Sequence, residues 1–228
     1  MPRRHRGGHA ISFQNRRAAG RALAGELSHL AGEPGLTVLG LARGGVPIGW
    51  EVAAALNAPL DAFLVRKLGV PGWPELAMGA LTTGGTLVRN DEVVRNLDVT
   101  EEQLRQTIER ESAELHRREA AYRGDRPAPE VRGRTVILVD DGIATGASML
   151  AAVRAVRRAG AARVVVAVPV GAAAACRRIG EESDELVCIS TPADFQAVGQ
   201  VYEDFTQTTD AEVCALLADQ PRHAEPDS

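Results

Sequence analysis

The amino-acid sequence predicts an α/β protein with a mostly parallel sheet flanked by helices. Short apolar runs alternate along the chain with amphipathic stretches of helical length, which is the order of parallel strands joined by crossover helices. The runs are apolar at successive positions, as expected of strands covered on both faces. The chain has 228 residues, of which 45% are hydrophobic, and this composition suits one α/β domain.

Composition and charge exclude several classes of protein. A net charge of -4 argues against a general nucleic-acid binder, and an aromatic content of 4% leaves few side chains to stack on bases. Cys176, Cys188 and Cys214 lack C-x-x-C spacing, so we expect free, buried thiols in a reducing compartment. No apolar run approaches the roughly 20 residues of a membrane span, and the basic N-terminus lacks the apolar core of a signal peptide. These features favour a cytoplasmic enzyme or regulator without nucleic-acid or membrane partners.

The first third of the chain is predicted to hold two helices and two strands. A helical pattern begins at Ser12 and keeps its apolar residues on one side until glycine and proline end it. The apolar run 36–42 is a predicted strand. A loop leads from it into a helix over 48–56, with Pro47 at the first position, where proline is favoured. A second strand is predicted over 60–68.

The middle of the chain combines breaking residues with one long helix. Glycine and proline recur through 69–99, so we expect a small, irregular and flexible hood that acts as a cover. Within it, 79–82 and 86–89 form a candidate hairpin. Thr100–Gln103 is a capping-box pattern that opens a charged helix ending near Tyr122. Three roles are open for this helix: it belongs to the cover, it forms the interface of a homodimer, or it presents a solvated face. Its many charged residues favour the solvated face.

The second half alternates regularly between strands and helices. The predicted strands are 135–140, 163–169 and 185–190, and the predicted helices are 147–158, 172–179 and 210–217. A polar linker precedes them. We therefore expect a single domain over 12–217, in which 69–126 is a hood insertion together with the long helix. Residues 1–11 are predicted to be a disordered tail and residues 218–228 a polar tail.

One stretch, Val136-Ile-Leu-Val-Asp-Asp-Gly-Ile-Ala-Thr-Gly-Ala-Ser148, carries most of the chemical information. Its apolar residues predict a buried strand, and Asp140 and Asp141 follow at the carboxyl end, where ligands bind in open α/β sheets. A glycine-containing loop then enters a helix, whose first N–H groups and dipole favour a phosphate. Thr145 and Ser148 add hydroxyl donors. Because carboxylates repel phosphate, they suit sugar hydroxyls or a cation nearby. The stretch predicts a site for a phosphorylated sugar.

Other nucleotide-binding loops do not fit this chain. A P-loop requires a Lys directly before its Ser or Thr, and Ala147 stands before Ser148. The glycines that follow the first predicted strand do not match G-x-G-x-x-G. A structural alternative is that Asp140 and Asp141 only cap the turn and the next helix. Two acids together with Thr-Gly and Ser exceed what a turn requires.

The stretch resembles the phosphoribosyl pyrophosphate (PRPP) motif of type I phosphoribosyltransferases: an apolar strand, two acidic residues, small residues, Thr-Gly and Ser or Thr. The resemblance extends over 12–217, is strongest at the motif and implies the type I phosphoribosyltransferase fold. It implies that Asp140 and Asp141 hold the ribose 2- and 3-hydroxyls. The residues implied for the 5-phosphate are Ala144, Thr145, Gly146, Ala147 and Ser148.

A second phosphate-binding loop is predicted after the first strand. A glycine pair exposes backbone N–H groups and an arginine donates two hydrogen bonds to phosphate, so Arg43, Gly44 and Gly45 suit pyrophosphate. In the family this loop often contains a non-proline cis peptide, which would lie near Arg43–Gly44. Lys67, near the end of the second predicted strand, is a candidate for offsetting pyrophosphate charge. The alternatives are an ordinary strand–helix turn and a solvated Arg66-Lys67 pair.

Two further segments, 66–80 and 201–205, resemble one uncharacterised bacterial subgroup of these proteins. In the second segment, Tyr202 and Phe205 either flank the acceptor or pack in the core. Ala144 stands where the 6-oxopurine branch has an Asp that contacts the base. The resemblance therefore disfavours hypoxanthine and guanine and leaves the acceptor open.

The resemblance implies Mg²⁺-dependent transfer of the 5-phosphoribosyl group from PRPP to a nitrogenous acceptor, with a nucleobase as first candidate and pyrophosphate as product. Asp140, Asp141, Arg43 and Lys67 would be the catalytic residues. Mg²⁺ would be held mainly by the ligand, with Asp140 or Asp141 as candidate protein ligand. Two other functions stay open: a regulatory protein that binds PRPP or a nucleotide with little or no catalysis, and a phosphohydrolase-like or sugar-phosphate-binding protein of another α/β class.

Overall fold

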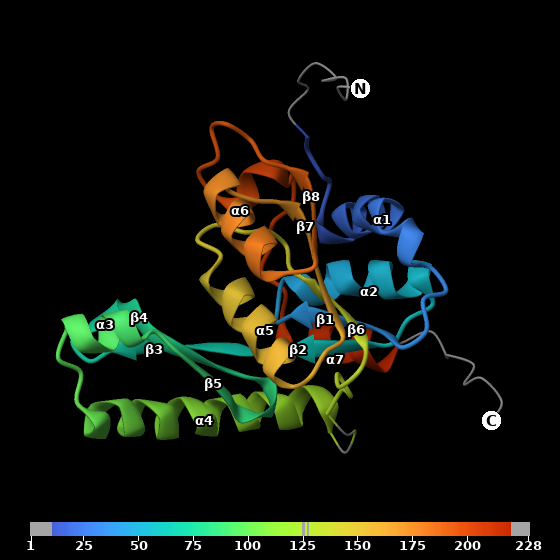
Figure 1. Ribbon diagram of the computed structural model, residues 1–228. Helices are drawn as coiled ribbons and strands as arrows, with labels where there is room; N and C mark the ends of the chain where they lie inside the picture. Colours follow the sequence, from blue (N-terminus) through green and yellow to red (C-terminus); the bar gives the residue numbers. More distant parts are fainter. Residues whose placement is uncertain (1–10, 125, 127, 220–228) are drawn as a thin grey trace.

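The computed structural model describes residues 11–124, 126 and 128–219, which form two separate β-sheets and their flanking helices (Figure 1). Five parallel strands have the order β2-β1-β6-β7-β8, and three antiparallel strands have the order β3-β4-β5. The strands are β1 (Leu36–Leu41), β2 (Leu60–Phe63), β3 (Val65–Val70), β4 (Trp73–Thr82), β5 (Thr86–Arg89), β6 (Thr135–Val139), β7 (Arg163–Val170) and β8 (Glu185–Ser190). The helices are α1 (Arg16–Glu26), α2 (Gly45–Leu56), α3 (Asp91–Asn96), α4 (Glu101–Arg123), α5 (Ala147–Arg158), α6 (Ala173–Glu182) and α7 (Asp210–Ala218). The predicted α/β class is confirmed.

Helices cover both faces of the parallel sheet. α1 and α2 pack on one face, and α5 and α6 pack on the other (Figure 1). Along β6, Ile137 and Val139 join the core beneath α1 and α2, whereas Val136 and Leu138 join the core beneath α5 and α6. Because both sides of the strand are buried, its sequence is apolar throughout.

The run predicted as one strand over 60–68 is divided between the two sheets. β2 pairs with β1 as far as Phe63, which lies opposite Leu41, the last residue of β1. At Leu64 the chain changes partner: its N–H donates to Thr83 Oγ1 at 2.8 Å, and Thr83 N–H donates to Leu64 O at 2.9 Å. The prediction was wrong because β1 ends there, and the following residues pair with β4.

The segment 69–99 is not the irregular hood that its glycines predicted. It supplies most of the antiparallel sheet and the short helix α3. Two of its glycines lie inside strands and permit close approach: a Cβ on Gly69 would lie 2.8 Å from Pro74 O, and one on Gly79 would lie 2.7 Å from Val88 O. Glycine therefore serves the pairing here, which is a known use of glycine inside strands. The predicted hairpin is confirmed as the pairing of β4 with β5.

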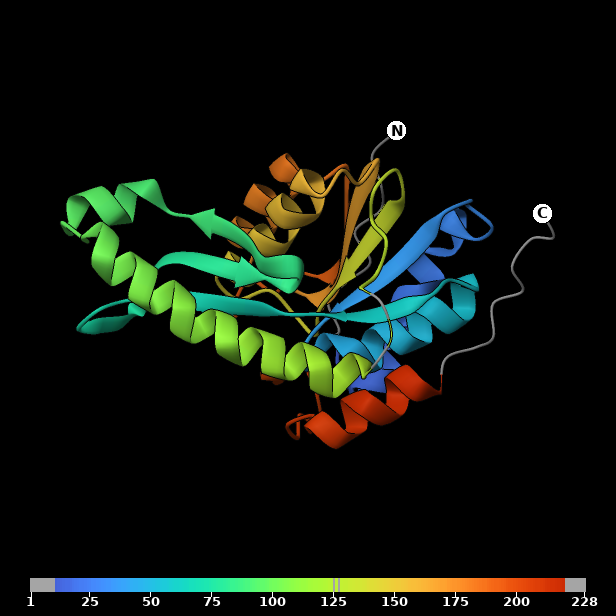
Figure 2. The ribbon, with the colours of Figure 1, turned by 90° about the horizontal axis from the view of Figure 1, so that it is seen from below.

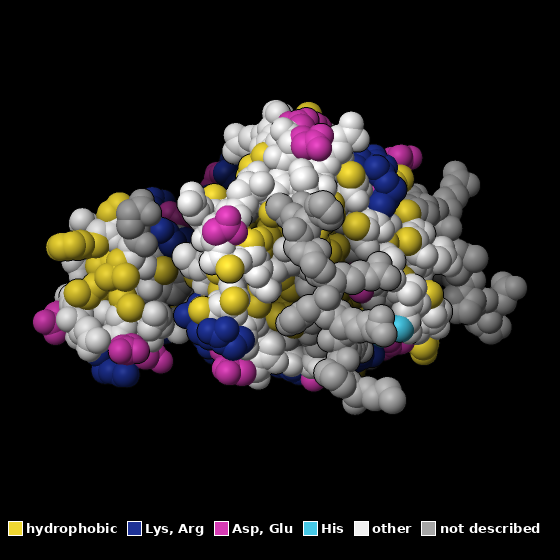
Figure 3. All heavy atoms as spheres, turned by 90° about the horizontal axis from the view of Figure 1, so that it is seen from above, with side chains coloured by type: hydrophobic (Ala, Val, Ile, Leu, Met, Phe, Trp, Pro, Cys, Tyr) yellow, Lys and Arg dark blue, Asp and Glu magenta, His cyan; other side chains and the backbone are white. Residues whose placement is uncertain are grey.

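The antiparallel sheet, α3 and α4 form an arm, residues 65–123, that projects from the main body (Figure 2). α4 runs along the sheet for most of its length and begins with the predicted capping box. Hydrophobic side chains gather on the projecting part in the space-filling view (Figure 3). The exposed large hydrophobic residues of the arm are Trp73, Leu76 and Leu97.

The first two helices begin at residues other than those predicted. α1 starts after Asn15, whose side chain accepts a backbone N–H from the first turn at 3.0 Å. Phe13 lies before the helix and forms a parallel bridge with Tyr202. α2 starts at Gly45, so Pro47 is its third residue and not its first. Proline is tolerated there because N–H groups of the first turn have no partner within the helix.

Several other sequence expectations concern the ends of the chain and its thiols. The predicted tails lie outside the described residues except for residue 11 and residues 218–219. The three cysteines are free, and only Cys176 is fully buried, with its Sγ 3.8 Å from Cys188 Sγ. None of the described helices combines the length and apolar character needed to cross a membrane.

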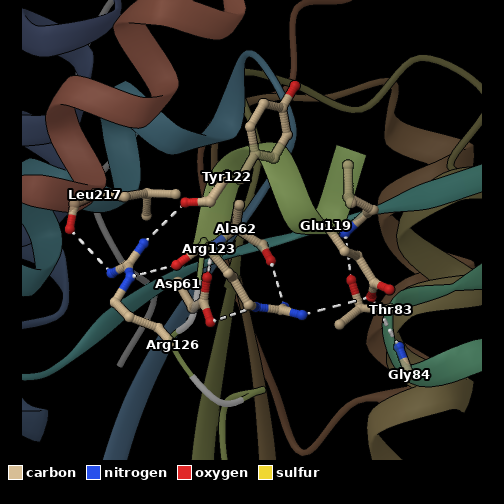
Figure 4. Close-up of polar contacts among 10 residues, drawn as sticks. Asp61, Ala62, Thr83, Gly84, Glu119, Tyr122, Arg123, Arg126 and Leu217 are labelled. Atoms are coloured by element: carbon tan, nitrogen blue, oxygen red, sulfur yellow. Dashed lines mark hydrogen bonds and ion pairs between the residues drawn. The ribbon is translucent and has the colours of Figure 1, made fainter. Parts of the chain in front are cut away.

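A buried ion pair fastens the arm to the main sheet at the C-terminal end of α4. Arg123 donates through Nε to Asp61 Oδ2 at 2.9 Å and through Nη2 to Ala62 O at 3.3 Å (Figure 4). The side chains of Arg123 and Asp61 are 8% and 12% exposed. One turn earlier, Glu119 accepts the N–H of Gly84 at 3.1 Å, which ties α4 to the turn between β4 and β5.

We expect Arg123→Met to lower the free energy of unfolding by about 3 kcal/mol, because the Asp61 carboxylate is left buried without its cation. Arg105→Met on the same helix is the matched control. Its side chain is 57% exposed and paired with Glu102 three residues away, so the change should stay within about 0.5 kcal/mol. Urea unfolding followed by circular dichroism measures both. A loss below about 1 kcal/mol for Arg123→Met would show that the pair does not fasten the arm.

Candidate functional site

The two predicted phosphate-binding loops lie side by side at one edge of the parallel sheet. β1 and β6 are neighbours with Gly40 opposite Val139, so both strands lead into loops at the same edge. A Cβ on Gly45 would lie 2.3 Å from Val139 O, and one on Gly44 would lie 2.1 Å from Asp141 Oδ2. Because the loops touch, neither position has room for a side chain.

Asp140 and Asp141 occupy the turn directly after β6. Asp140 Oδ1 accepts the Asp141 N–H at 2.8 Å. Asp141 Oδ2 accepts a hydrogen bond from Arg16 Nε at 2.9 Å and lies 2.8 Å from Arg16 Nη2. The side chains of Arg16 and Asp141 are 11% and 16% exposed, so the acidic pair and its cation are largely withdrawn from water.

Burial raises the pKa of both carboxyl groups. The pKa of Asp140 lies well above its usual range because desolvation and the neighbouring Asp141 charge act in the same direction. Desolvation also raises the pKa of Asp141, while Arg16 opposes that rise through its charge and its hydrogen bond. Arg16 therefore limits the cost of placing two carboxylates together.

The loop 144–148 presents donors to solvent. All of its residues except Gly146 are exposed, and Gly146 has a φ of 77°, which favours glycine. Gly146 is the N-cap of α5 and has no side chain to bond the first turn, whose Ala147 N–H makes only a long hydrogen bond, 3.4 Å, to Thr145 Oγ1. The start of α5 therefore suits an anion. Arg178 on α6 donates to Thr145 O at 2.6 Å and adds a positive charge beside the loop.

Arg43 follows β1 after a cis peptide bond with Ala42, one peptide earlier than the resemblance implied. Its side chain is 28% exposed, and its Nη1 lies 3.8 Å from Asp210 Oδ1. Asp210 also accepts a hydrogen bond from Tyr122 OH. Arg43 is thus partly exposed, and its ion pair with Asp210 is long. Its guanidinium can therefore turn toward an anionic ligand.

Lys67 borders a cavity of about 430 Å³ between the arm and α5. Neighbouring residues of β3 face opposite ways: Arg66 pairs with Glu111 of α4 at 2.6 Å, whereas Lys67 lines the cavity. Ser148 lines the same cavity, so Lys67 and the predicted 5-phosphate loop share it, with Arg43 outside the lining. The other basic residues of the lining are Arg89, Arg154 and Arg178. Arg89 is paired with Asp91, which also lines the cavity, and Arg154 is paired with Glu182. Basic residues still outnumber acidic ones in the lining, which suits an anionic ligand.

Tyr202 and Phe205 lie beside the acidic pair. Tyr202 is buried, donates its hydroxyl to Asp141 O at 2.7 Å and stacks on Phe205 with the ring centres 5.0 Å apart. Phe205 is 38% exposed, and the Arg16 guanidinium lies 4.1 Å from its ring centre. Tyr202 thus packs in the core and holds the backbone of the site. Contact of Phe205 with an acceptor stays a prediction.

Sequence reasoning missed Arg16 and Arg178. Arg16 lies in the first turn of α1, where the helix dipole disfavours cations and the turn contains no acidic residue. That unusual placement is the signal that could have identified it. Arg178 carries no comparable signal, because its contact with Thr145 depends on how α6 packs beside α5.

The chain is similar to several known proteins. The family model described as "Phosphoribosyl transferase domain" matches residues 12–206. Two Mycobacterium tuberculosis proteins, named "Putative phosphoribosyl transferase MT0597" and "Putative phosphoribosyl transferase Rv0571c", are each 48% identical over 205 residues. These matches cover 90% of this chain and 46% of the relatives, so the chain spans about half of their length. The crystal structure of TT1426 from Thermus thermophilus has a TM-score of 0.81 and 45% identity, over 91% of this chain and 98% of that one.

We expect Gly45→Ala to lower the free energy of unfolding by about 1–3 kcal/mol, because its Cβ would overlap a backbone oxygen that cannot move without shifting β6. Gly25→Ala is the control, since no atom lies within 4 Å of the added Cβ on α1. That change should be neutral or stabilising by up to about 1 kcal/mol. Chemical unfolding compares the two variants. Equal effects would show that the loops have room to separate.

Asp140→Asn should raise the free energy of unfolding at pH 7. The pKa of Asp140 is raised in the folded protein, so the ionised carboxylate destabilises the fold above that pKa. As pH falls through the folded pKa toward the usual value of 3.8, the folded protein takes up the proton first and the destabilisation is relieved. The gain from Asn should therefore shrink over this window. Urea unfolding at several pH values measures it, with the exposed Asp194→Asn as control. A gain that is absent at pH 7 would contradict the raised pKa.

Proposed function

The chain belongs to the phosphoribosyl transferase domain family, and from this membership we propose that it transfers the 5-phosphoribosyl group of PRPP to a nitrogenous acceptor with release of pyrophosphate. A nucleobase is the first acceptor to test. The observation that carries the proposal is the meeting of an acidic pair, a helix start capped by glycine and a glycine-pair loop at one sheet edge. This edge offers donors for two phosphate-bearing groups and acceptors for the hydroxyls between them.

The proposed binding roles follow from charge and hydrogen-bonding capacity. The N–H groups at the start of α5, with the hydroxyls of Thr145 and Ser148, donate to the 5-phosphate. Asp140 and Asp141 accept hydrogen bonds from the ribose 2- and 3-hydroxyls, because ionised carboxylates are acceptors only. Fixing the sugar at both ends positions C1 for attack.

The proposed transfer breaks the bond between C1 and a pyrophosphate oxygen and forms a bond between C1 and the acceptor nitrogen on the opposite face. An N–H acceptor releases its proton to water as this bond forms. The bonding electrons leave with pyrophosphate, whose charge is offset by Arg43 and the N–H groups of the Gly44–Gly45 loop. The predicted contribution of Lys67 to this charge requires the ligand to reach the cavity that Lys67 shares with Ser148. The ribose gains positive charge as pyrophosphate departs, and Asp140 and Asp141 stabilise that charge. Residues of the arm line the cavity beside the predicted 5-phosphate loop, so the arm would limit the access of water to bound PRPP. Excluding water matters there because hydrolysis of PRPP would compete with transfer.

Mg²⁺ is part of the proposal. When bound, it would neutralise charge on the pyrophosphate group. No cluster of three or more His, Cys, Asp or Glu residues that could hold a metal is found in the described part of the chain. Asp140 and Asp141 nevertheless provide carboxylate oxygens, the donor type that Mg²⁺ prefers. This set of donors fits an ion held chiefly by oxygens of PRPP, with Asp140 or Asp141 as protein ligand.

Incubation with labelled PRPP, Mg²⁺ and a panel of purines, pyrimidines and other amines tests the proposal. Pyrophosphate release that depends on one acceptor supports transfer. PRPP binding by calorimetry without release across the panel would instead identify a PRPP-binding regulator. The absence of any PRPP affinity would overturn the proposal. This chain spans about half of the length of the M. tuberculosis relatives, so the activity of those longer proteins would not establish its own. The panel is therefore run on this chain.

Asp140→Asn, Asp141→Asn and Thr145→Val should each weaken PRPP binding by roughly 1–3 kcal/mol, the scale of a lost charged or buried hydrogen bond. Arg43→Ala should weaken binding of PRPP and pyrophosphate more than binding of a nucleoside monophosphate. Arg21→Ala, which removes a 60% exposed guanidinium from α1, is the control and should bind all three ligands like the wild type. Calorimetry measures each affinity. If both Asn variants bind PRPP normally, the assignment of the acidic pair is wrong.

A further inference from the structure

Arg16 is held on three sides beside the acidic pair. Its Nε and Nη2 lie 2.9 Å and 2.8 Å from Asp141 Oδ2. Its Nη1 donates to Thr206 O at 2.7 Å, and its guanidinium carbon lies 4.1 Å from the centre of the Phe205 ring. A planar guanidinium in contact with a carboxylate, a carbonyl and an aromatic face is restricted to one orientation.

Asp141 is fixed in turn by contacts from three parts of the chain. Arg16 on α1 binds Oδ2, and Tyr202 donates its hydroxyl to the Asp141 carbonyl at 2.7 Å. Gly44, in the loop after β1, leaves room for Oδ2, since a Cβ there would lie 2.1 Å from this oxygen. Arg16 and Tyr202, which lie outside the two predicted phosphate-binding loops, therefore hold one carboxylate oxygen and the backbone carbonyl of Asp141.

We infer that Arg16 is a positioning residue that presents the Asp141 carboxylate to a ribose hydroxyl in one orientation before the ligand arrives. The inference rests on the proposed function, because it takes Asp141 as an acceptor for that hydroxyl. Arg16 acts through Asp141 and does not touch the sugar. In a merely structural role, Arg16 would join α1 to the segment 202–206, and its loss would weaken every ligand of the site alike.

Two sugar phosphates distinguish these roles. Ribose 5-phosphate carries the 2- and 3-hydroxyls, and 2,3-dideoxyribose 5-phosphate lacks both. The wild-type protein should bind the first more tightly by roughly tenfold or more, the value of one charged hydrogen bond. Arg16→Met should lower the affinity for ribose 5-phosphate by about fivefold to tenfold and leave the affinity for the dideoxy compound within about twofold. The preference for hydroxyls is therefore what the variant should lose.

The chain provides a closely matched control at the next position. Arg17 also combines an ion pair, with Glu51 at 2.6 Å, and a ring contact, with Trp50 at 4.2 Å, but its partners lie on α2 and its side chain is 45% exposed, against 11% for Arg16. Arg17→Met should retain the preference for ribose 5-phosphate. Arg16→Lys keeps the charge without the planar fork and should give an intermediate preference. If circular dichroism shows that Arg16→Met does not fold, Arg16→Lys replaces it in the comparison of the two sugar phosphates.

Each outcome of the calorimetry bears on the inference. An unchanged preference in both Arg16 variants, or equal losses of affinity for the two sugar phosphates, would overturn the positioning role and leave the proposed function in place. A wild-type protein that binds neither compound, or binds both equally, would overturn the ribose-binding role of the acids and the inference with it. Loss of the preference in Arg16→Met but not in Arg17→Met supports the inference.

Discussion

The candidate site depends on the close approach of two backbone segments at the carboxyl ends of β1 and β6. Three glycines make this approach possible: a Cβ on Gly40 would lie 2.9 Å from Gly45 O, and Cβ atoms on Gly44 and Gly45 would meet Asp141 Oδ2 and Val139 O at 2.1 Å and 2.3 Å. The start of α2 therefore folds back over its own strand and against the next one. As a result, the N–H groups of one loop and the carboxylates of the other are brought within the span of a single small ligand.

The parts of the fold that could be predicted are those specified by local pattern. β6, the loop after it and α5 follow from an apolar run, two acids, glycines and a helical pattern that lie next to one another in the sequence. The capping box at Thr100 and the hairpin of β4 and β5 are equally local. That both phosphate-binding loops lie at one edge follows from sequence, because parallel strands present their carboxyl ends at a common edge. Their adjacency does not, since β2 to β5 separate β1 from β6 in the chain.

The features that could not be predicted depend on partners distant in the chain. The segment 60–68 contains no turn or breaking residue at Leu64, where the partner changes from β1 to β4, because the end of β1 decides where the change occurs. Gly69 and Gly79 were interpreted as breaks, yet each gives room to a neighbouring strand. The role of Arg16 requires α1 to pack near the turn after β6, and periodicity along a helix does not specify that arrangement.

The supports of Asp141 come from segments far apart in the chain. Phe13 forms a β-bridge with Tyr202, and Arg16 donates a hydrogen bond to the carbonyl of Thr206. Residues near position 15 therefore reach their final contacts only after residues beyond position 200 have been synthesised. On the ribosome, both glycine loops and both acids emerge well before the segment that carries Tyr202 and Phe205. A nascent chain released or cleaved before residue 202 would hold both glycine loops and both acids and would lack Tyr202, Phe205 and Thr206, which contact Asp141 or Arg16. The orientation of Asp141 therefore depends on a segment that is synthesised late and not on the central strands alone.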